Sequence, residues 1–272
     1  MLAAVSERVL VHSVKPKQVA LPVEHGGWSF LFEPIIAGSA IAISAAGGWI
    51  ALMMVGAFML RRPLGVYASQ AAAGRTNDYR SLAAKFSLVF SVPFIAGLAG
   101  AVWSAEAVHL LPLAILPPLA IYQLYCDVCR QNRRLLPEVV GAIAMSASAA
   151  SIILAGTGDR SLAAAVWFFL AARLITSIIY VRNRLDLEKG KRYSFAVPVF
   201  AHELGLLGVA VLAVAGELPY LAVAAFAILT ARAIVGLSRY RTPAKAMRIG
   251  IIEVAFGIIS LTALLVGYHA GI

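Results

Sequence analysis

Six ionisable side chains lie inside strongly apolar stretches of the sequence, where an unpaired charge is costly and often marks a functional site. They are Glu33, Arg173, His202, Glu203, Arg232 and Glu253. Arginine binds phosphate or carboxylate through paired hydrogen bonds, whereas carboxylates and histidine can carry protons. The set is therefore compatible with anion binding, with a proton relay, or with internal ion pairs that need no ligand.

The most informative spacing surrounds Arg173. Arg173, Ser177, Tyr180 and Arg184 are separated by four, three and four residues, which places them on one face of a helix. Two guanidinium groups with a hydroxyl and a phenol between them suit an anionic head group. Tyrosine and arginine are also common anchors at the end of a membrane helix. That alternative explains Tyr180 and Arg184 well, but it explains the deeper Arg173 poorly.

Nine apolar stretches, each long enough to span a membrane, must position these residues. They cover residues 28–46, 48–67, 84–104, 106–125, 137–156, 161–181, 194–215, 218–237 and 247–269. The first two stretches meet at Gly47 and Gly48, which indicates a tight turn. Three prolines, at positions 112, 117 and 118, should kink the fourth stretch because proline removes a backbone hydrogen bond.

Composition agrees with this organisation. Of the 272 residues, 61% are hydrophobic and only 13% are charged, whereas a soluble domain would be about 25% charged. The sequence therefore predicts an all-α, polytopic membrane helix bundle. We expect residues 1–27 to be a cytoplasmic lead-in and residues 28–272 to form a single transmembrane domain.

Basic residues fall in the lead-in and in every second connection between the stretches. Of the 23 lysines and arginines, only Arg160 lies on the opposite side, and Arg173 and Arg232 lie within spans. By the positive-inside rule this predicts a multi-pass protein of the inner (cell) membrane, with a cytoplasmic N-terminus and the C-terminus on the opposite side. The net charge of +10 is then explained by contact with anionic lipid, so we expect the bilayer as partner and no nucleic acid.

The entry to the first stretch carries the most distinctive motif, Pro22-Val23-Glu24-His25-Gly26-Gly27-Trp28. It resembles the P-x-E-H-G-x-W signature of the YwiC-like integral membrane family. Two further segments resemble that family, residues 61–64 with 79–80, and residues 177–182 with 188–191. The resemblance implies an integral membrane protein and no particular activity. His25 beside Glu24 could act as a proton shuttle or ligand, or the pair could cap the first helix.

The nine-span plan also resembles the UbiA-type prenyltransferase fold. That resemblance implies acidic motifs in the second-to-third and sixth-to-seventh connections, which would hold magnesium and a prenyl diphosphate. Gly190 and Lys191 match the second motif and Asp186 falls on its second acid, but Arg182 replaces the first acid. Magnesium requires carboxylate oxygens. We therefore expect no metal and no cofactor, and an anion that meets the arginines directly.

These observations favour a basic, cytoplasm-facing cavity that binds an anionic amphipathic lipid or isoprenoid, with a transferase activity left open and no catalytic residue assigned. The predicted binding residues are Glu24, His25, Arg62, Arg80, Arg173, Ser177, Tyr180, Arg182, Arg184, Asp186 and Lys191.

Two alternatives remain. The embedded glutamates and His202 could serve a small-solute or proton-coupled transporter. Alternatively, the charges could pair internally in a non-catalytic membrane scaffold. Burial of Arg173 and Arg232 against glutamates without a void would favour the scaffold, whereas a pocket lined by Arg173, Arg182 and His25 would favour binding.

Overall fold

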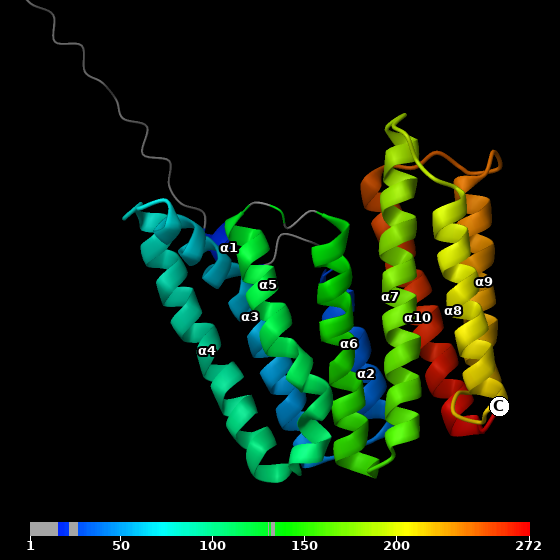
Figure 1. Cartoon of the computed structure of the whole chain (residues 1–272), viewed down its shortest axis with the longest axis horizontal. Coiled ribbons are helices and arrows are strands. Elements are labelled where there is room, and N and C mark those ends of the chain that lie inside the picture. Colours follow the sequence, from blue (N-terminus) through cyan, green and yellow to red (C-terminus); the bar gives the residue numbers. More distant parts are fainter. Residues whose placement is uncertain (1–15, 22–26, 130, 132–133) are drawn as a thin grey trace, which may run out of the picture.

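The computed structural model describes residues 16–21, 27–129, 131 and 134–272. Within this part of the chain every regular element is a helix (Figure 1). The elements are α1 (Pro16–Ala20), α2 (Gly27–Ile41), α3 (Ala45–Ala72), α4 (Asp78–Ser104), the 3-10 helix η1 (Ala107–Ile115), α5 (Leu116–Val128), α6 (Leu135–Thr157), α7 (Arg160–Glu188), α8 (Ala196–Val214), α9 (Tyr220–Leu237) and α10 (Ala246–Ala270). The predicted polytopic helical bundle is confirmed.

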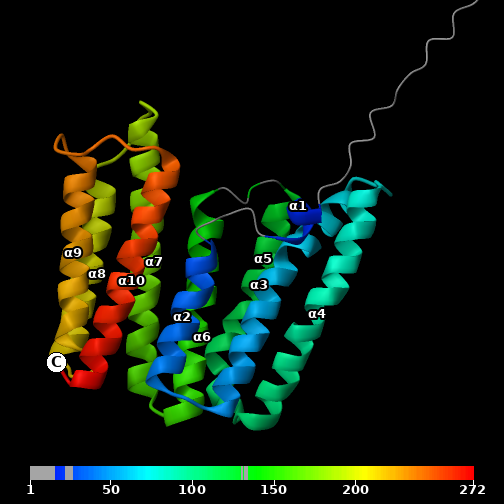
Figure 2. The ribbon, with the colours of Figure 1, turned by 180° about the vertical axis from the view of Figure 1, so that it is seen from behind.

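Eight of these segments, with η1 and α5 taken together, are long and apolar enough to cross a membrane. The predicted first span is also helical, but α2 has only 15 residues. At 1.5 Å per residue it is about 22 Å long, shorter than the hydrocarbon core of about 30 Å. In both ribbon views α2 lies in the middle of the molecule, and it packs mainly on α6 and α10 (Figures 1 and 2).

The turn between the first two helices differs from the sequence prediction. It lies at residues 42–44, and Gly47 and Gly48 belong to the first turn of α3. The Ser44 hydroxyl accepts a hydrogen bond from the Gly47 amide at 3.0 Å and so caps the helix N-terminus. Gly47 is needed for packing instead, because a Cβ there would lie 3.0 Å from the side chain of Ile152.

The prolines shape the fourth span as expected. It begins as the 3-10 helix η1, which contains Pro112, and becomes α-helical at Leu116. Pro117 and Pro118 then occupy the first turn of α5, where a missing amide proton costs little.

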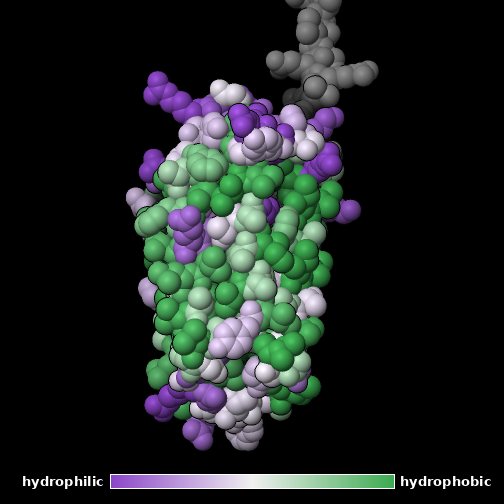
Figure 3. Space-filling model, turned by 90° about the vertical axis from the view of Figure 1, so that its right-hand side faces the viewer, coloured by the Kyte–Doolittle hydropathy of each residue, from purple (hydrophilic) through white to green (hydrophobic). Residues whose placement is uncertain are grey.

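The helices divide into two lateral groups (Figures 1 and 2). The helices α3, α4 and α5 lie on one side, α7 to α10 on the other, and α2 and α6 between them. The larger apolar core joins the second group to α2 and α6, and it includes Phe169 and Phe226, which meet edge to face with ring centres 5.7 Å apart. Most of the middle of the face seen in Figure 3 is apolar, and hydrophilic residues gather at its two ends. This distribution suits a protein surrounded by lipid.

Candidate functional site

The first part of the site is an ion pair between α7 and the central helix α2. Arg173 of α7 donates from Nη1 to Glu33 Oε2 of α2 at 2.6 Å, and from Nη2 to the backbone carbonyl of Glu253 in α10 at 3.2 Å. The Arg173 and Glu33 side chains are only 3% and 11% exposed. Space for the pair depends on Gly257, since a Cβ there would lie 2.4 Å from both Arg173 Nη2 and Glu33 Oε1. Arg173 therefore connects α2, α7 and α10.

A second buried pair continues from Glu253. Its carboxylate Oε1 accepts a hydrogen bond from Arg232 Nη1 of α9, and Arg232 Nη2 lies 3.2 Å from His202 Nε2 of α8. A guanidinium has only donors, so His202 Nε2 must accept. The proton is then on Nδ1, which donates to the Pro198 carbonyl at 2.7 Å. His202 is thus a neutral acceptor that orients Arg232.

Two aromatic rings lie close to the Arg232 guanidinium. Its central carbon lies 4.2 Å from the ring centre of Tyr180 and 5.1 Å from that of Phe256, within range of cation–π attraction. Gly236 makes room for Tyr180, because a Cβ there would lie 2.2 Å from the Tyr180 hydroxyl. We call Glu33, Arg173, Glu253, Arg232 and His202 the buried charge network.

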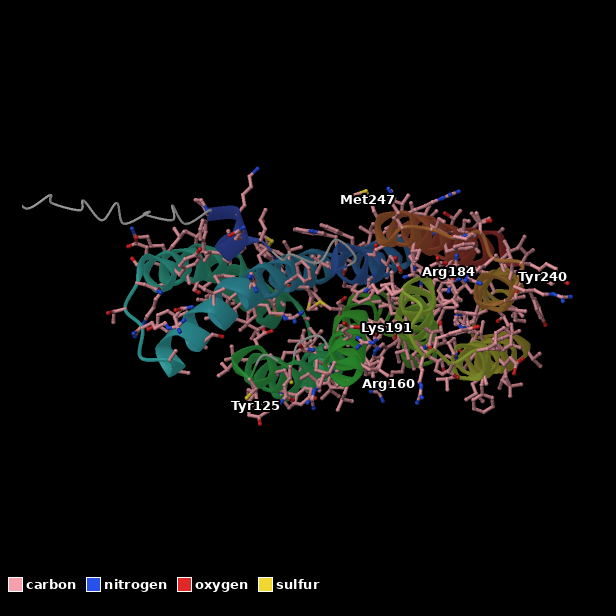
Figure 4. The ribbon with its side chains drawn as sticks, turned by 90° about the horizontal axis from the view of Figure 1, so that it is seen from above. Tyr125, Arg160, Arg184, Lys191, Tyr240 and Met247 are labelled. Atoms are coloured by element: carbon pink, nitrogen blue, oxygen red, sulfur yellow. The ribbon has the colours of Figure 1, made fainter. Side chains whose placement is uncertain are left out.

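An open cavity of about 520 Å³ lies beside this network, between α9 and α10 and against α7. We call it the α9–α10 cavity. Its charged lining consists of four arginines and a single glutamate, Arg184, Arg232, Arg241, Arg248 and Glu253. Apolar and aromatic walls complete it, including Ile228, Ile252, Phe256, Tyr180 and Tyr240. Seen from above, Arg184 and Tyr240 lie within the α7–α10 group and far from Tyr125 on the other side (Figure 4).

The arginines of the cavity differ in how they are held. Arg184 donates to the carbonyls of Gly236 and Thr242 and pairs with Glu188 at 2.9 Å. Arg248 is exposed and forms no ion pair with the residues that the structure describes.

Four buried polar atoms of the lining have no hydrogen-bond partner within the described chain: Arg184 Nε, Arg232 Nε, Arg241 Nε and Glu253 Oε2. Such atoms favour a ligand that can satisfy them.

Five of the six embedded ionisable residues thus come together, and Glu203 does not. It follows the fully buried His202, but its own side chain is exposed on the outer face of α8. Successive residues of a helix point about 100° apart, so neighbours in sequence can face the core and the lipid respectively.

The predicted binding residues are more scattered. Tyr180 and Arg184 line the cavity, whereas Arg173 and Ser177 are buried and absent from its lining. Arg62 donates to the Gln18 carbonyl at 3.2 Å, and Arg80 lies 5.2 Å from the Tyr67 ring centre, both in the other group of helices.

Three of the remaining predicted positions lie in the last turns of α7 or just beyond it. Arg182 pairs with Glu138 at 2.8 Å, Asp186 is half-buried, and Lys191 is exposed. Glu24 and His25 fall outside the described residues.

Arg173 is buried against Glu33, as the scaffold alternative expected. Arg232 is also buried against a glutamate, Glu253, but this second pair borders a void and so does not meet the criterion for the scaffold.

Sequence reasoning missed Arg241 and Arg248 as site residues and counted them only as orientation signals. The available signal was their position in the short connection that joins the helices of Arg232 and Glu253 (Arg241) and directly after it (Arg248).

Residues 21–153 match the model of the family described as YwiC-like protein. The resemblance stated from the motif at residues 22–28 is therefore confirmed over that part of the chain. Glu33 lies within the YwiC-like match, whereas Arg173 and the whole α9–α10 cavity lie beyond it. Comparisons with curated proteins and with solved structures each found no match.

Proposed function

We propose that this integral membrane protein binds an anionic amphipathic lipid or isoprenoid in the α9–α10 cavity. The observation that supports the proposal is the lining, which combines four arginines with apolar walls on membrane-spanning helices. Arginine suits phosphate and carboxylate groups because its planar donors match their oxygens. The apolar walls can contact a hydrocarbon chain at the same time.

The size and openness of the cavity agree with such a ligand. Its volume of about 520 Å³ is in the range typical of small-molecule sites, about 300–1,000 Å³. The cavity is not enclosed, so a lipid can place its head group inside while its chains remain in the bilayer. The buried charge network lies behind it and fixes the orientation of Arg232.

We also propose an orientation of the cavity relative to the membrane. The connections that carry most of the basic residues lie at the same end of the bundle as the α9–α10 connection (Figure 1). By the positive-inside rule this end faces the cytoplasm, in the inner (cell) membrane, and the C-terminus lies on the opposite side. The cavity then opens into the cytoplasmic half of the bilayer, among anionic head groups.

Lipid analysis of the purified protein tests this function. We expect the full-length protein, purified in mild detergent, to retain an anionic lipid or isoprenoid that mass spectrometry identifies. Arg248→Gln should lower its retention about tenfold, because one charge-assisted hydrogen bond is worth about 1.5–3 kcal/mol. Arg248 is exposed and unpaired within the described chain, so its loss should leave the fold intact.

Arg75→Gln is the matched control, since Arg75 is exposed near the α3–α4 connection in the other group of helices. It makes the same charge change and should leave lipid retention unchanged. Equal retention by the wild-type protein and the Arg248 variant would argue against the cavity as the site.

A further inference from the structure

Glu253 stands out in the α9–α10 cavity as the one acid among the lining residues. Its Oε1 accepts from Arg232, and its backbone carbonyl accepts from Arg173. The other carboxylate oxygen, Oε2, has no hydrogen-bond partner within the described residues, and the side chain is 13% exposed. A buried acceptor without a donor costs stability, so Oε2 is suited to receive a donor from a ligand.

The same oxygen opposes a simple anion. A phosphate that approaches Arg232 and Arg248 also approaches the Glu253 carboxylate, and two like charges repel each other more strongly away from bulk water. A head group that also carries a hydroxyl changes this balance. Its phosphate can bind the arginines while its hydroxyl donates to Oε2, which converts a repulsive contact into a charge-assisted hydrogen bond.

We infer that Glu253 determines head-group specificity, and that the ligand is a phosphodiester lipid whose head group bears a hydroxyl donor. The inference rests on the proposed function and narrows the ligand class of the same cavity. The exposed Arg248 binds the phosphate, together with Arg241, which is half-buried and lies 3.5 Å from Glu188. Glu253 accepts from the hydroxyl farther along α10, and Ile228 and Ile252 contact the hydrocarbon chains.

A comparison of two lipids of equal charge tests the contribution of the head-group hydroxyl. Phosphatidylglycerol and phosphatidylethanol with the same acyl chains are both monoanionic phosphodiesters, and only the first has head-group hydroxyls. We expect the delipidated wild-type protein to bind phosphatidylglycerol about tenfold more tightly, as measured by native mass spectrometry or by displacement of a fluorescent lipid. A site built to hydrogen-bond a hydroxyl disfavours an analogue that lacks it.

Two variants test which residue causes the preference for phosphatidylglycerol. Arg248→Gln should weaken both lipids by a similar factor and leave their ratio near tenfold, because Arg248 contacts the shared phosphate. Glu253→Gln should reduce the ratio to about one. Since Glu253→Gln also removes the partner of Arg232 and could impair folding, the wild-type ratio is the primary measurement and needs no variant.

The outcomes distinguish this inference from the proposed function. Equal binding of the two anionic lipids, both above phosphatidylcholine, would overturn the role of Glu253 and leave anionic lipid binding in place. Binding of neither lipid above phosphatidylcholine would overturn the proposed function itself. A preference for phosphatidylglycerol that survives in folded Glu253→Gln would also refute the assignment to Glu253.

Discussion

Arg173 and Glu33 are both buried, so each charge depends on the other for a partner. Their atoms meet at 2.6 Å, the arginine side chain is 3% exposed, and Gly257 leaves the space that they occupy. Removing one partner of a buried pair leaves an uncompensated charge, whereas replacing both partners by neutral groups can be nearly neutral. At the residue scale, this pair therefore contributes to the contact between α7 and the central helix α2.

Single and double variants of the pair should therefore differ in stability. Arg173→Met should lower the free energy of unfolding by about 3–5 kcal/mol. Adding Glu33→Gln to that variant should recover most of the loss. Denaturant unfolding in detergent micelles measures both changes. Arg192→Met serves as control because Arg192 is exposed near the start of α8. Arg173 is absent from the cavity lining, so the destabilised Arg173 variant should still bind lipid when it is folded. An Arg173 variant as stable as the wild-type protein would contradict the prediction.

The helices α3 and α4 show how small residues set the spacing of whole elements. A Cβ on Gly56 would lie 2.4 Å from the Phe94 backbone nitrogen, and a Cβ on Gly97 would lie 2.3 Å from that of Met53. Both distances are far below van der Waals contact, so the two backbones can approach this closely only with glycine at the crossing. Small residues at helix crossings are a common means of association inside membranes, where the hydrophobic effect does not drive helices together.

At the scale of elements, Gly97→Ala should therefore separate α3 from α4. We expect a loss of about 1–3 kcal/mol in the free energy of unfolding, the usual cost of overpacking. The same substitution at Gly250 of α10 is the control, because a Cβ there meets nothing within 4 Å. Comparable unfolding midpoints for the two variants would show that the crossing tolerates a methyl group.

At the scale of the whole molecule, the two ends of the bundle differ because the basic connections lie at one of them. The α3–α4, α7–α8 and α9–α10 connections lie at one end of the bundle, and the α6–α7 connection, directly before Arg160 at the start of α7, lies at the other (Figure 1). The α9–α10 cavity is therefore tied to one side of the membrane. Its proposed exposure to cytoplasmic head groups depends on that orientation.

Cysteine accessibility tests the orientation. In a background with Cys126→Ser and Cys129→Ser, a membrane-impermeant maleimide added to intact cells should label Arg160→Cys and leave Arg75→Cys unlabelled. Both positions are exposed, so accessibility depends on the side of the membrane. Permeabilised cells should allow labelling of both. The reverse pattern on intact cells would place the cavity in the outer half of the bilayer.

The amino-acid sequence alone was enough to predict the helices of this protein and to identify it as a polytopic helical membrane protein. In a membrane each helix must satisfy its own backbone hydrogen bonds, so a long apolar run predicts its own structure without knowledge of its neighbours. The predicted stretches 161–181 and 247–269 correspond to α7 and α10, each extended by polar residues at its ends. Helix ends were less certain, since the Ser44 cap moved the first turn away from Gly47.

Only the tertiary structure decided which charges meet and where a ligand can enter. The apolar stretches could identify Glu33, Arg173, Glu203 and Glu253 as embedded charges, but the rotation of each helix made Glu33 the ion-pair partner of Arg173 and turned Glu203 outward. The cavity depends on where α9, α10 and α7 leave space between them, and that spacing is set by packing among segments distant in sequence. For this reason Arg248, first interpreted as an orientation signal, became a site residue only once its neighbours were known.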